Sequence, residues 1–267
     1  MNDYKQNINK GFSKISKHYE DLDKTSDLIN WMRSRIRKNL EKKLLPGEKI
    51  LEINAGSGID AVYFASLGYD VLATDIADGM LSFIDKKSKQ KEIRNFLRYK
   101  KVDNNNLKSL HPEKFHHIFS NFGGLNCSSP SELENIFKQF PDLLYSGGTL
   151  TLVIMPKICP WEWLRFFKNK DLAFRRLSKK PVLANIEGVK VRTYYYNVKD
   201  VKKLLANDFK DFSVENISFF GPTGNRYFFK QKHPVLFKIL TSLDKPTSKI
   251  PFLQGIGDYF VISAVKK

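Results

Sequence analysis

The stretch Leu51-Glu52-Ile53-Asn54-Ala55-Gly56-Ser57-Gly58 decides the fold of this chain. The apolar run from Lys49 to Asn54 predicts a short buried strand, the close glycines predict a tight turn, and the run from Ile59 to Leu67 predicts a helix. Because glycine has no Cβ atom, such a turn lets the backbone approach a nucleotide closely. Gly56 and Gly58 are therefore candidate ligand-binding residues.

An acidic residue follows at the distance that a nucleoside site requires. The segment from Asp70 to Thr74 predicts a second strand, which ends at Asp75, 17 residues after Gly58. A carboxylate at the carboxyl end of this strand can accept hydrogen bonds from both hydroxyl groups of an adenosine ribose. The glycine turn and Asp75 together predict a nucleoside cofactor.

The sequence of this turn is compatible with two different cofactors. The run Gly56-Ser57-Gly58-Ile59-Asp60-Ala61 also matches the dinucleotide pattern G-x-G-x-x-A, which would make the protein an NAD-dependent oxidoreductase. NAD would place its pyrophosphate beside Glu52 and Asp60, whose negative charges oppose it. S-adenosylmethionine carries a sulfonium and an amino group, which these acids complement. The charges favour S-adenosylmethionine, and Asp60 either contacts the ligand or caps the helix.

Strand-like and helix-like segments continue to alternate along the chain. Strands are expected at 115–122, 149–155, 212–220 and 258–265, and helices after Asn197 and after Pro130, where Ser131 opens a capping-box pattern. This alternation predicts an α/β fold with a doubly wound, mainly parallel sheet covered by helices on both faces. Such sheets bind ligands at the carboxyl ends of their strands.

The ordered set of motifs resembles the class I S-adenosylmethionine-dependent methyltransferase family. In that family an acid on the first strand, a glycine turn and a second acid occur where this chain has Glu52, Gly56, Gly58 and Asp75. The resemblance covers residues 13–155. It implies a seven-stranded, Rossmann-like sheet with an antiparallel last strand, S-adenosyl-L-methionine as cofactor and S-adenosyl-L-homocysteine as product.

The resemblance also implies further site residues. Asp103-Asn104-Asn105-Asn106-Leu107 is similar to the family's adenine-contacting segment, and Ser120-Asn121-Phe122 is similar to the end of its fourth strand, beside the transferring methyl group. Asn121 is therefore a candidate catalytic residue. The candidate cofactor-binding set is Tyr19, Glu52, Asn54, Ala55, Gly56, Ser57, Gly58, Asp75, Ile76, Met80, Asp103, Asn104 and Asn121.

Two positions depart from the family pattern. Asn54 stands where glycine is usual, and asparagine tolerates left-handed backbone conformations better than most residues. The common Phe-Asp opening of the fourth strand is replaced by Phe115-His116. The segments 120–126 and 159–162 are similar to a bacterial subgroup that methylates small molecules or quinones, and this similarity does not identify the acceptor.

We expect one methyltransferase domain over residues 1–267, with a helical cap at 1–45. Two insertions, 156–196 and 221–257, leave the carboxyl ends of strands and are expected to form a substrate cover. Their aromatic side chains either line the binding site of an acceptor or form a small core of their own: Trp161, Trp163, Phe166, Phe167, Tyr194, Tyr195, Tyr196, Tyr227 and Phe228.

The expected reaction is an in-line methyl transfer to a small-molecule or lipid-like acceptor. Some acceptors need a base, for which histidine is suited, and His233 is the candidate. RNA or another nucleic acid is the main rival acceptor because basic and aromatic residues mix between Arg226 and Lys230, although no Asn-Pro-Pro-Tyr motif follows the fourth strand. A noncatalytic cofactor-binding protein is a third alternative.

Composition limits the partners and the compartment. The chain has 45 Lys and Arg against 28 Asp and Glu, a net charge of +17 that could attract nucleic acid or an anionic membrane. Lysine is nevertheless spread along the whole chain, and the densest basic clusters lie at 33–43 and 175–180. No apolar run approaches the roughly 20 residues of a transmembrane helix, and no secretion signal or metal-ligand spacing occurs. A cytoplasmic protein without a metal is expected.

Overall fold

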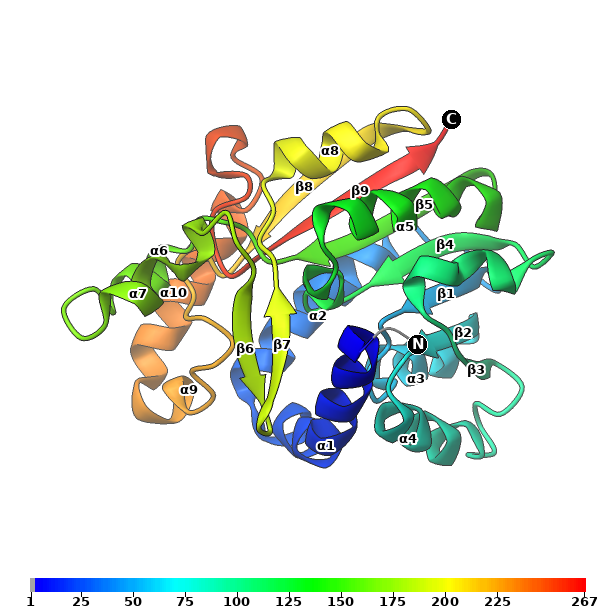
Figure 1. The fold of residues 1–267 in the computed structure, drawn as a ribbon, viewed down its shortest axis with the longest axis horizontal. Coiled ribbons are helices and arrows are strands. Elements are labelled where there is room, and N and C mark those ends of the chain that lie inside the picture. The colour runs from blue at the N-terminus through cyan, green and yellow to red at the C-terminus, as the bar shows by residue number, and fades with distance from the viewer. Residues whose placement is uncertain (1–2) are drawn as a thin grey trace.

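A seven-stranded sheet with the order β3-β2-β1-β4-β5-β9-β8 runs through the molecule, whose computed structural model describes residues 3–267 (Figure 1). β1 pairs in parallel with β2 and β4, and β9 runs antiparallel to both β5 and β8. The predicted mainly parallel sheet with an antiparallel last strand is confirmed. The strands are β1 (Lys49–Ile53), β2 (Asp70–Asp75), β3 (Leu97–Lys101), β4 (Phe115–Ser120), β5 (Leu144–Ile154), β8 (Phe209–Ile217) and β9 (Tyr259–Lys266).

Helices cover both faces of this sheet because side chains alternate along its strands. Leu51 and Ile53 of β1 pack into one core, and Ile50 packs into the other. The first core contains η1 (Asn104–Leu110), α5 (Pro130–Leu143) and α8 (Val198–Leu205). The second contains α2 (Asp27–Glu41), α3 (Ile59–Ser66) and α4 (Asp78–Ser88). The doubly wound fold is therefore confirmed.

The helical cap expected at 1–45 consists of two helices. α1 (Asp3–Thr25) precedes α2, whose N-cap Ser26 accepts a hydrogen bond from the backbone N–H of Ile29. Four apolar residues of α2 are completely buried: Leu28, Met32, Ile36 and Leu40. No helix in the described chain is long and apolar enough to cross a membrane.

Segments outside the alternating pattern lie at the carboxyl ends of the strands. The first insertion forms α6 (Pro160–Trp163), α7 (Lys170–Phe174), η3 (Arg175–Leu177) and an antiparallel hairpin of β6 (Val182–Ile186) and β7 (Val189–Thr193). The hairpin stands away from the main sheet and packs on α1 (Figure 1). The second insertion forms α9 (Phe229–Lys232), α10 (Pro234–Thr247) and η4 (Pro251–Leu253). A short η2 (Gly124–Cys127) follows β4.

Some predicted boundaries were wrong, among them the start of α5 and the end of β8. The capping box of α5 is formed by Ser129 and Glu132 rather than Ser131, because Pro130 occupies the first helical position, where its missing N–H costs nothing. β8 ends at Ile217 rather than continuing to residue 220. The next three backbone N–H groups, of residues 218–220, donate to the carboxylate of Asp244 at 2.8–2.9 Å and so leave the strand ladder.

Candidate functional site

The predicted glycine turn forms at the carboxyl end of β1. Asn54, Gly56 and Gly58 have φ angles of 54°, 56° and 77°, so Asn54 adopts the left-handed conformation that asparagine tolerates better than most residues. A Cβ atom added to Gly58 would lie 2.8 Å from Cγ1 of Ile84, whereas one added to Gly56 meets no described atom within 4 Å. Gly58 is therefore required for packing of α4, and Gly56 faces open space.

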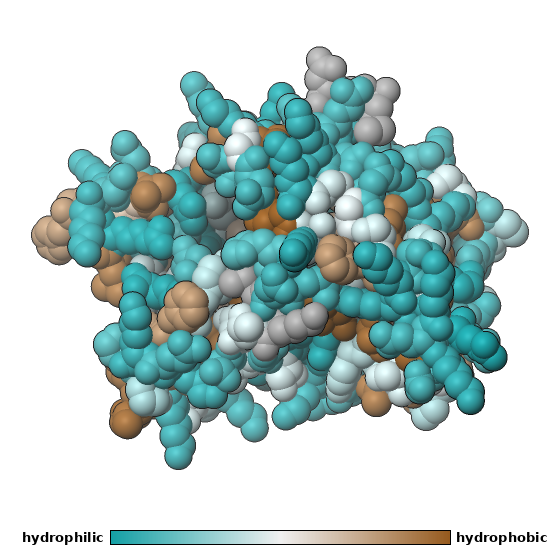
Figure 2. All heavy atoms as spheres, turned by 90° about the horizontal axis from the view of Figure 1, so that it is seen from below, coloured by the Kyte–Doolittle hydropathy of each residue, from teal (hydrophilic) through white to brown (hydrophobic). Residues whose placement is uncertain are grey.

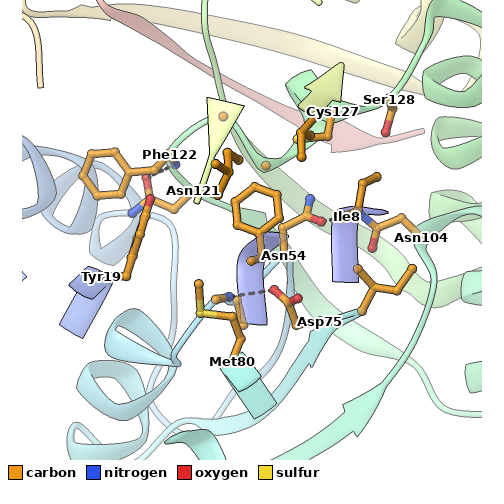
Figure 3. Close-up of a pocket in the computed structure, with 18 of the residues that line it drawn as sticks. Ile8, Tyr19, Asn54, Asp75, Met80, Asn104, Asn121, Phe122, Cys127 and Ser128 are labelled. Atoms are coloured by element: carbon orange, nitrogen blue, oxygen red, sulfur yellow. Dashed lines mark hydrogen bonds between the residues drawn. The ribbon is translucent and has the colours of Figure 1, made fainter. Parts of the chain in front are cut away.

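Asp75 links the end of β2 to this turn. Its carboxylate accepts hydrogen bonds from the backbone N–H groups of Gly56 and Ala77, both at 2.9 Å, and it points into a cavity (Figure 3). Burial raises the pKa of Asp75 to about 6, although these N–H groups favour the ionised form. A ligand with hydroxyl donors would find oriented oxygen acceptors here.

Glu52 lies deeper in the same wall and has unused hydrogen-bonding capacity. Its side chain is buried, and Oε2 has no hydrogen-bond partner among the residues described. Burial, together with the negative charge of Asp60, raises the pKa of Glu52 well above its usual range. A ligand carrying a positive charge or an N–H donor would satisfy this orphaned oxygen.

Asp60 does not cap the helix, although it lines the same cavity as Glu52 and Asp75. It is held by Arg33 and Arg37 of α2, with the Arg37 Nε atom 2.7 Å from its carboxylate, and Asn121 donates to it at 2.7 Å. Burial alone would raise the pKa of Asp60, but the two arginines outweigh burial and lower it. The N-cap of α3 is Gly58. Asp60 is therefore the centre of a buried ion-pair network that joins α2 and α3.

Polar residues after β3 complete the opposite end of the site. The side chain of Asn104 donates to the Oδ1 atom of Asn54 at 2.6 Å, so the predicted adenine segment is joined to the glycine turn. Asp103 is the N-cap of η1 and forms an ion pair with Lys5 of α1. Figure 3 shows Asp75 between the two ends of the site. Ile8 and Asn104 lie at one end, and Tyr19, Asn121 and Phe122 lie at the other.

These residues line one cavity of about 310 Å³. The ends of β1, β2 and β4 form its floor, and α1 and the β6–β7 hairpin cover it, contributing Ile8 and Phe12 from α1 and Ile186 and Val191 from the hairpin. A ligand in this cavity would lie between the sheet edge and α1.

Several polar contacts hold α1 over the cavity. The Tyr4 hydroxyl group donates to the backbone oxygen of Cys127 at 2.8 Å and of Arg192 at 3.1 Å. The backbone N–H of Gly79 donates to the Ser13 hydroxyl oxygen at 2.9 Å. α1 therefore closes the site through bonds to η2, β7 and the start of α4.

A second cavity of about 220 Å³ adjoins the first. Tyr19, Phe122 and Met155 line both cavities. The second cavity also contains a buried ion-pair network of Glu162, Arg175, Arg176 and Asp258, together with uncharged polar side chains at Thr223, Asn225 and Tyr227. Both insertions therefore contribute to its walls.

The structure brings together twelve of the thirteen predicted cofactor residues. All thirteen line the first cavity except Gly58, which packs against Ile84. The amide of Asn121 is engaged on both sides, since it donates to Asp60 and accepts a hydrogen bond from the backbone N–H of Phe122 at 2.7 Å. His233 is exposed at the start of α10 and lines neither cavity, so the structure does not bring it to this site.

Sequence reasoning missed the residues that cover the first cavity. Lys5, Ile8 and Phe12 belong to α1, whose helical spacing was not recognised, and the hairpin was hidden in an insertion. The signal for that hairpin was present, because the alternating buried and exposed residues of β7 follow a Glu187-Gly188 turn. Of the nine insertion aromatics, Tyr227 lines a cavity, Tyr196 belongs to the main core, and Phe167 is exposed.

The first cavity fits S-adenosylmethionine. Asp75 presents acceptors for ribose hydroxyl groups, and the orphaned Glu52 oxygen offers an acceptor for a cationic amino group. The Ser57 hydroxyl group is also buried without a partner among the described residues. Residues 3–267 contain no group of three or more His, Cys, Asp and Glu side chains that could hold a metal ion.

Comparisons with known proteins agree with this fit. The sequence model of a family described as "Methyltransferase domain" matches residues 50–148, which include the glycine turn, Asp75 and Asn121. No curated protein sequence is similar enough to this chain to give a match. The fold, the site and the family match over residues 50–148 support an S-adenosylmethionine-dependent methyltransferase, with S-adenosylmethionine as its cofactor.

Solved structures share the fold at low sequence identity. A protein of Methanosarcina mazei described as an S-adenosylmethionine-dependent methyltransferase is 18% identical with a TM-score of 0.57, covering 85% of this chain and 96% of that one. A "possible histamine N-methyltransferase" of Thermotoga maritima is 18% identical with a TM-score of 0.55, covering 96% and 99%. Phosphoethanolamine N-methyltransferase 2 of Haemonchus contortus, in complex with S-adenosyl-L-methionine, is 16% identical with a TM-score of 0.57, covering 87% and 52%.

Proposed function

We propose that this methyltransferase acts on a small-molecule or lipid-like acceptor held in the second cavity. The observation that carries the proposal is that the two cavities meet at Tyr19, Phe122 and Met155. In-line methyl transfer requires the acceptor atom to approach the methyl carbon to about 3–3.5 Å. An acceptor site must therefore adjoin one end of the cofactor site.

The chemistry of the first cavity supports this end as the reacting end. Asp75 is suited to the ribose, so the adenine and the sulfonium lie on opposite sides of it. The orphaned carboxyl group of Glu52 suits the cationic half of the cofactor, and Asn121 and Phe122 lie on the side that adjoins the second cavity. When bound, S-adenosylmethionine supplies the electrophilic methyl group at this junction.

The second cavity would orient an acceptor rather than take its proton. Glu162 binds Arg175 at 2.6 Å and Arg176 at 3.1 Å, and Arg176 binds Asp258 at 2.6 Å. Burial alone would raise the pKa of Glu162, but the arginines outweigh it and lower the pKa, so this carboxylate is a poor base. The balanced charges suit a compact neutral molecule, or the head group of a lipid, that hydrogen bonds to Asn225 or Tyr227.

The arginines of the two basic clusters do not favour a nucleic-acid acceptor. Arg33 and Arg37 form ion pairs with Asp60, and Arg35 forms one with Asp244. Arg175 and Arg176 are paired in the same way with Glu162 and Asp258. These arginines stabilise contacts within the fold and do not form a free cationic surface for phosphates.

The test incubates the purified enzyme and methyl-labelled S-adenosylmethionine with an extract of the source cells, separated into water-soluble metabolites, lipids and nucleic acids. Asn225→Trp fills the second cavity, and we expect it to abolish labelling of one metabolite or lipid fraction while leaving the affinity for S-adenosylhomocysteine unchanged. Asn207→Trp is the matched control, because Asn207 is exposed and lines neither cavity.

Each outcome bears on the proposal. Label in a metabolite or lipid that disappears only with Asn225→Trp supports it, and the mass of that product identifies the acceptor. Label in the nucleic-acid fraction contradicts it. Cofactor binding without a labelled product in any fraction would also contradict it.

A further inference from the structure

The exposed apolar side chains of this protein are concentrated at one end of the molecule. We call this surface the cover end and define it as residues 163–180 and 228–245. It contains 12 of the 19 exposed large hydrophobic side chains among the described residues, seven in the first segment and five in the second. Figure 2 shows brown patches among teal side chains at the end that carries α7 and α10 in Figure 1.

The first segment presents an aromatic tip. Phe167 is 95% exposed between α6 and α7, and its ring contacts that of Phe166 at 5.3 Å between centroids. Phe166 in turn contacts Phe174 at 5.8 Å, which itself lies next to Trp163. The tip is therefore a supported cluster of rings rather than one stray side chain.

The second segment presents one apolar face of a helix. Val235, Ile239 and Leu243 follow one another at spacings of four residues on α10 and are all exposed, with Val235 72% exposed. The opposite side of α10 is anchored, since Phe237 and Asp244 are buried. A rigid helix thus holds this apolar row toward the outside.

Many Lys and Arg residues occur in the same two segments as these apolar groups. Eight of them form no ion pair with a described residue: Arg165, Lys168, Lys170, Lys179, Lys180, Lys232, Lys238 and Lys245. The one exposed acid within the cover end is Asp171, because Asp244 is buried. Aromatic and aliphatic side chains ringed by Lys and Arg are the combination that binds the surface of an anionic bilayer.

We propose that the cover end docks on an anionic lipid surface. The aromatic tip and the apolar row of α10 insert among the head groups, and the surrounding cations contact lipid phosphate and carboxylate groups. A second copy of this chain fits the surface less well, because two cover ends brought face to face would oppose like charges.

Docking would place the acceptor cavity next to the membrane. The walls of the second cavity include Glu162, Arg175 and Tyr227, which belong to or border the same two segments. Delivery of a lipid-like acceptor from the bilayer is a consequence that rests on the proposed function. The docking itself does not depend on methyl transfer and can be measured without it.

The test is flotation of the full chain with vesicles of phosphatidylcholine alone, or of phosphatidylcholine and phosphatidylserine in equal amounts. We expect binding to the mixed vesicles that added salt reverses. Leu164→Ser with Phe167→Ser, and separately Lys168→Glu with Lys170→Glu, should each weaken binding roughly tenfold or more. These side chains are all exposed, so an unchanged melting temperature will show that the variants fold.

Matched pairs elsewhere on the surface control for general effects of polarity and charge. Leu45→Ser with Leu67→Ser removes two exposed leucines, and Lys203→Glu with Lys210→Glu reverses two exposed charges, all outside the cover end. Both controls should bind like the unaltered protein. Absence of binding, or equal binding by all variants, overturns the proposal. A dimer in ultracentrifugation that Leu164→Ser with Phe167→Ser dissociates would assign the surface to self-association instead.

Discussion

Asp75 is the candidate cofactor residue whose charge is most directly tested by a change of pH. Its pKa of about 6 means that the ionised acceptor form dominates above that pH and is lost as the pH falls through it. We therefore expect the affinity for S-adenosylhomocysteine to fall about tenfold for each pH unit below about 6. Calorimetric titration between about pH 5 and pH 8 measures this.

Two substitutions on the same strand isolate the effect. Asp75→Asn should bind more weakly near neutral pH and show little further change on acidification. Asp70→Asn, at the other end of β2 and outside the cavity, should keep the full pH dependence. If acidification weakens binding to Asp75→Asn as steeply as to the unaltered protein, another group titrates.

The ion pairs of Asp60 lead to a prediction about the stability of the fold. Asp60→Ala would remove the buried carboxylate that pairs with both Arg33 and Arg37, and we expect a loss of about 3–5 kcal/mol in the free energy of unfolding. Asp85→Ala removes the partly exposed partner of Lys89 and should cost about 1 kcal/mol or less. Urea denaturation compares the two. Similar losses would show that the buried network contributes no more than a surface pair.

At the scale of elements, α1 depends on a close approach to α4. A Cβ atom added to Gly79 would lie 2.6 Å from the Cα and backbone oxygen atoms of Ser13, so Gly79→Ala must displace α1. A Cβ added to Gly11 would meet Val189 and Val191 of the hairpin at an ordinary 3.5 Å. The same substitution is therefore disruptive at one contact of α1 and tolerated at another.

We expect Gly79→Ala to weaken S-adenosylhomocysteine binding on the order of tenfold, mainly through faster release, because overpacking costs roughly 1–3 kcal/mol. Gly11→Ala should leave release unchanged and stabilise the helix by up to about 1 kcal/mol. Stopped-flow displacement of bound S-adenosylhomocysteine measures both rates. Identical rates for the two variants would mean that α1 does not close the site.

At the scale of the whole molecule, the cofactor cavity joins α1, the sheet and the hairpin of the first insertion. If residues 1–267 behave as one domain, calorimetry should show a single unfolding transition. S-adenosylhomocysteine at 100 times its Kd should stabilise the folded chain by about 2.7 kcal/mol and raise Tm by about 5–10 °C. A separate transition whose midpoint temperature does not change when S-adenosylhomocysteine is added would instead indicate that the insertions unfold independently.

Local chemistry explains why much of the site was predictable. Asn54, Gly56 and Gly58 form a turn between two apolar elements, and Asp75 ends the next strand, so neighbouring residues suffice to locate them. β3 is harder to recognise because four of its five residues are exposed and no apolar pattern marks it. His233 was assigned from its residue type alone, and that type does not reveal that the start of α10 lies away from the cavities.

The sequence by itself determined the alternating fold, the glycine turn and most of the candidate cofactor residues, because each depends on periodicity or on residues close in the chain. The tertiary structure alone decided that Arg33 and Arg37 bind Asp60, and that Arg176 joins Glu162 to Asp258. It also decided that α1 and the β6–β7 hairpin cover one cavity. These contacts join residues far apart in sequence, and only the packing of the whole chain brings them together.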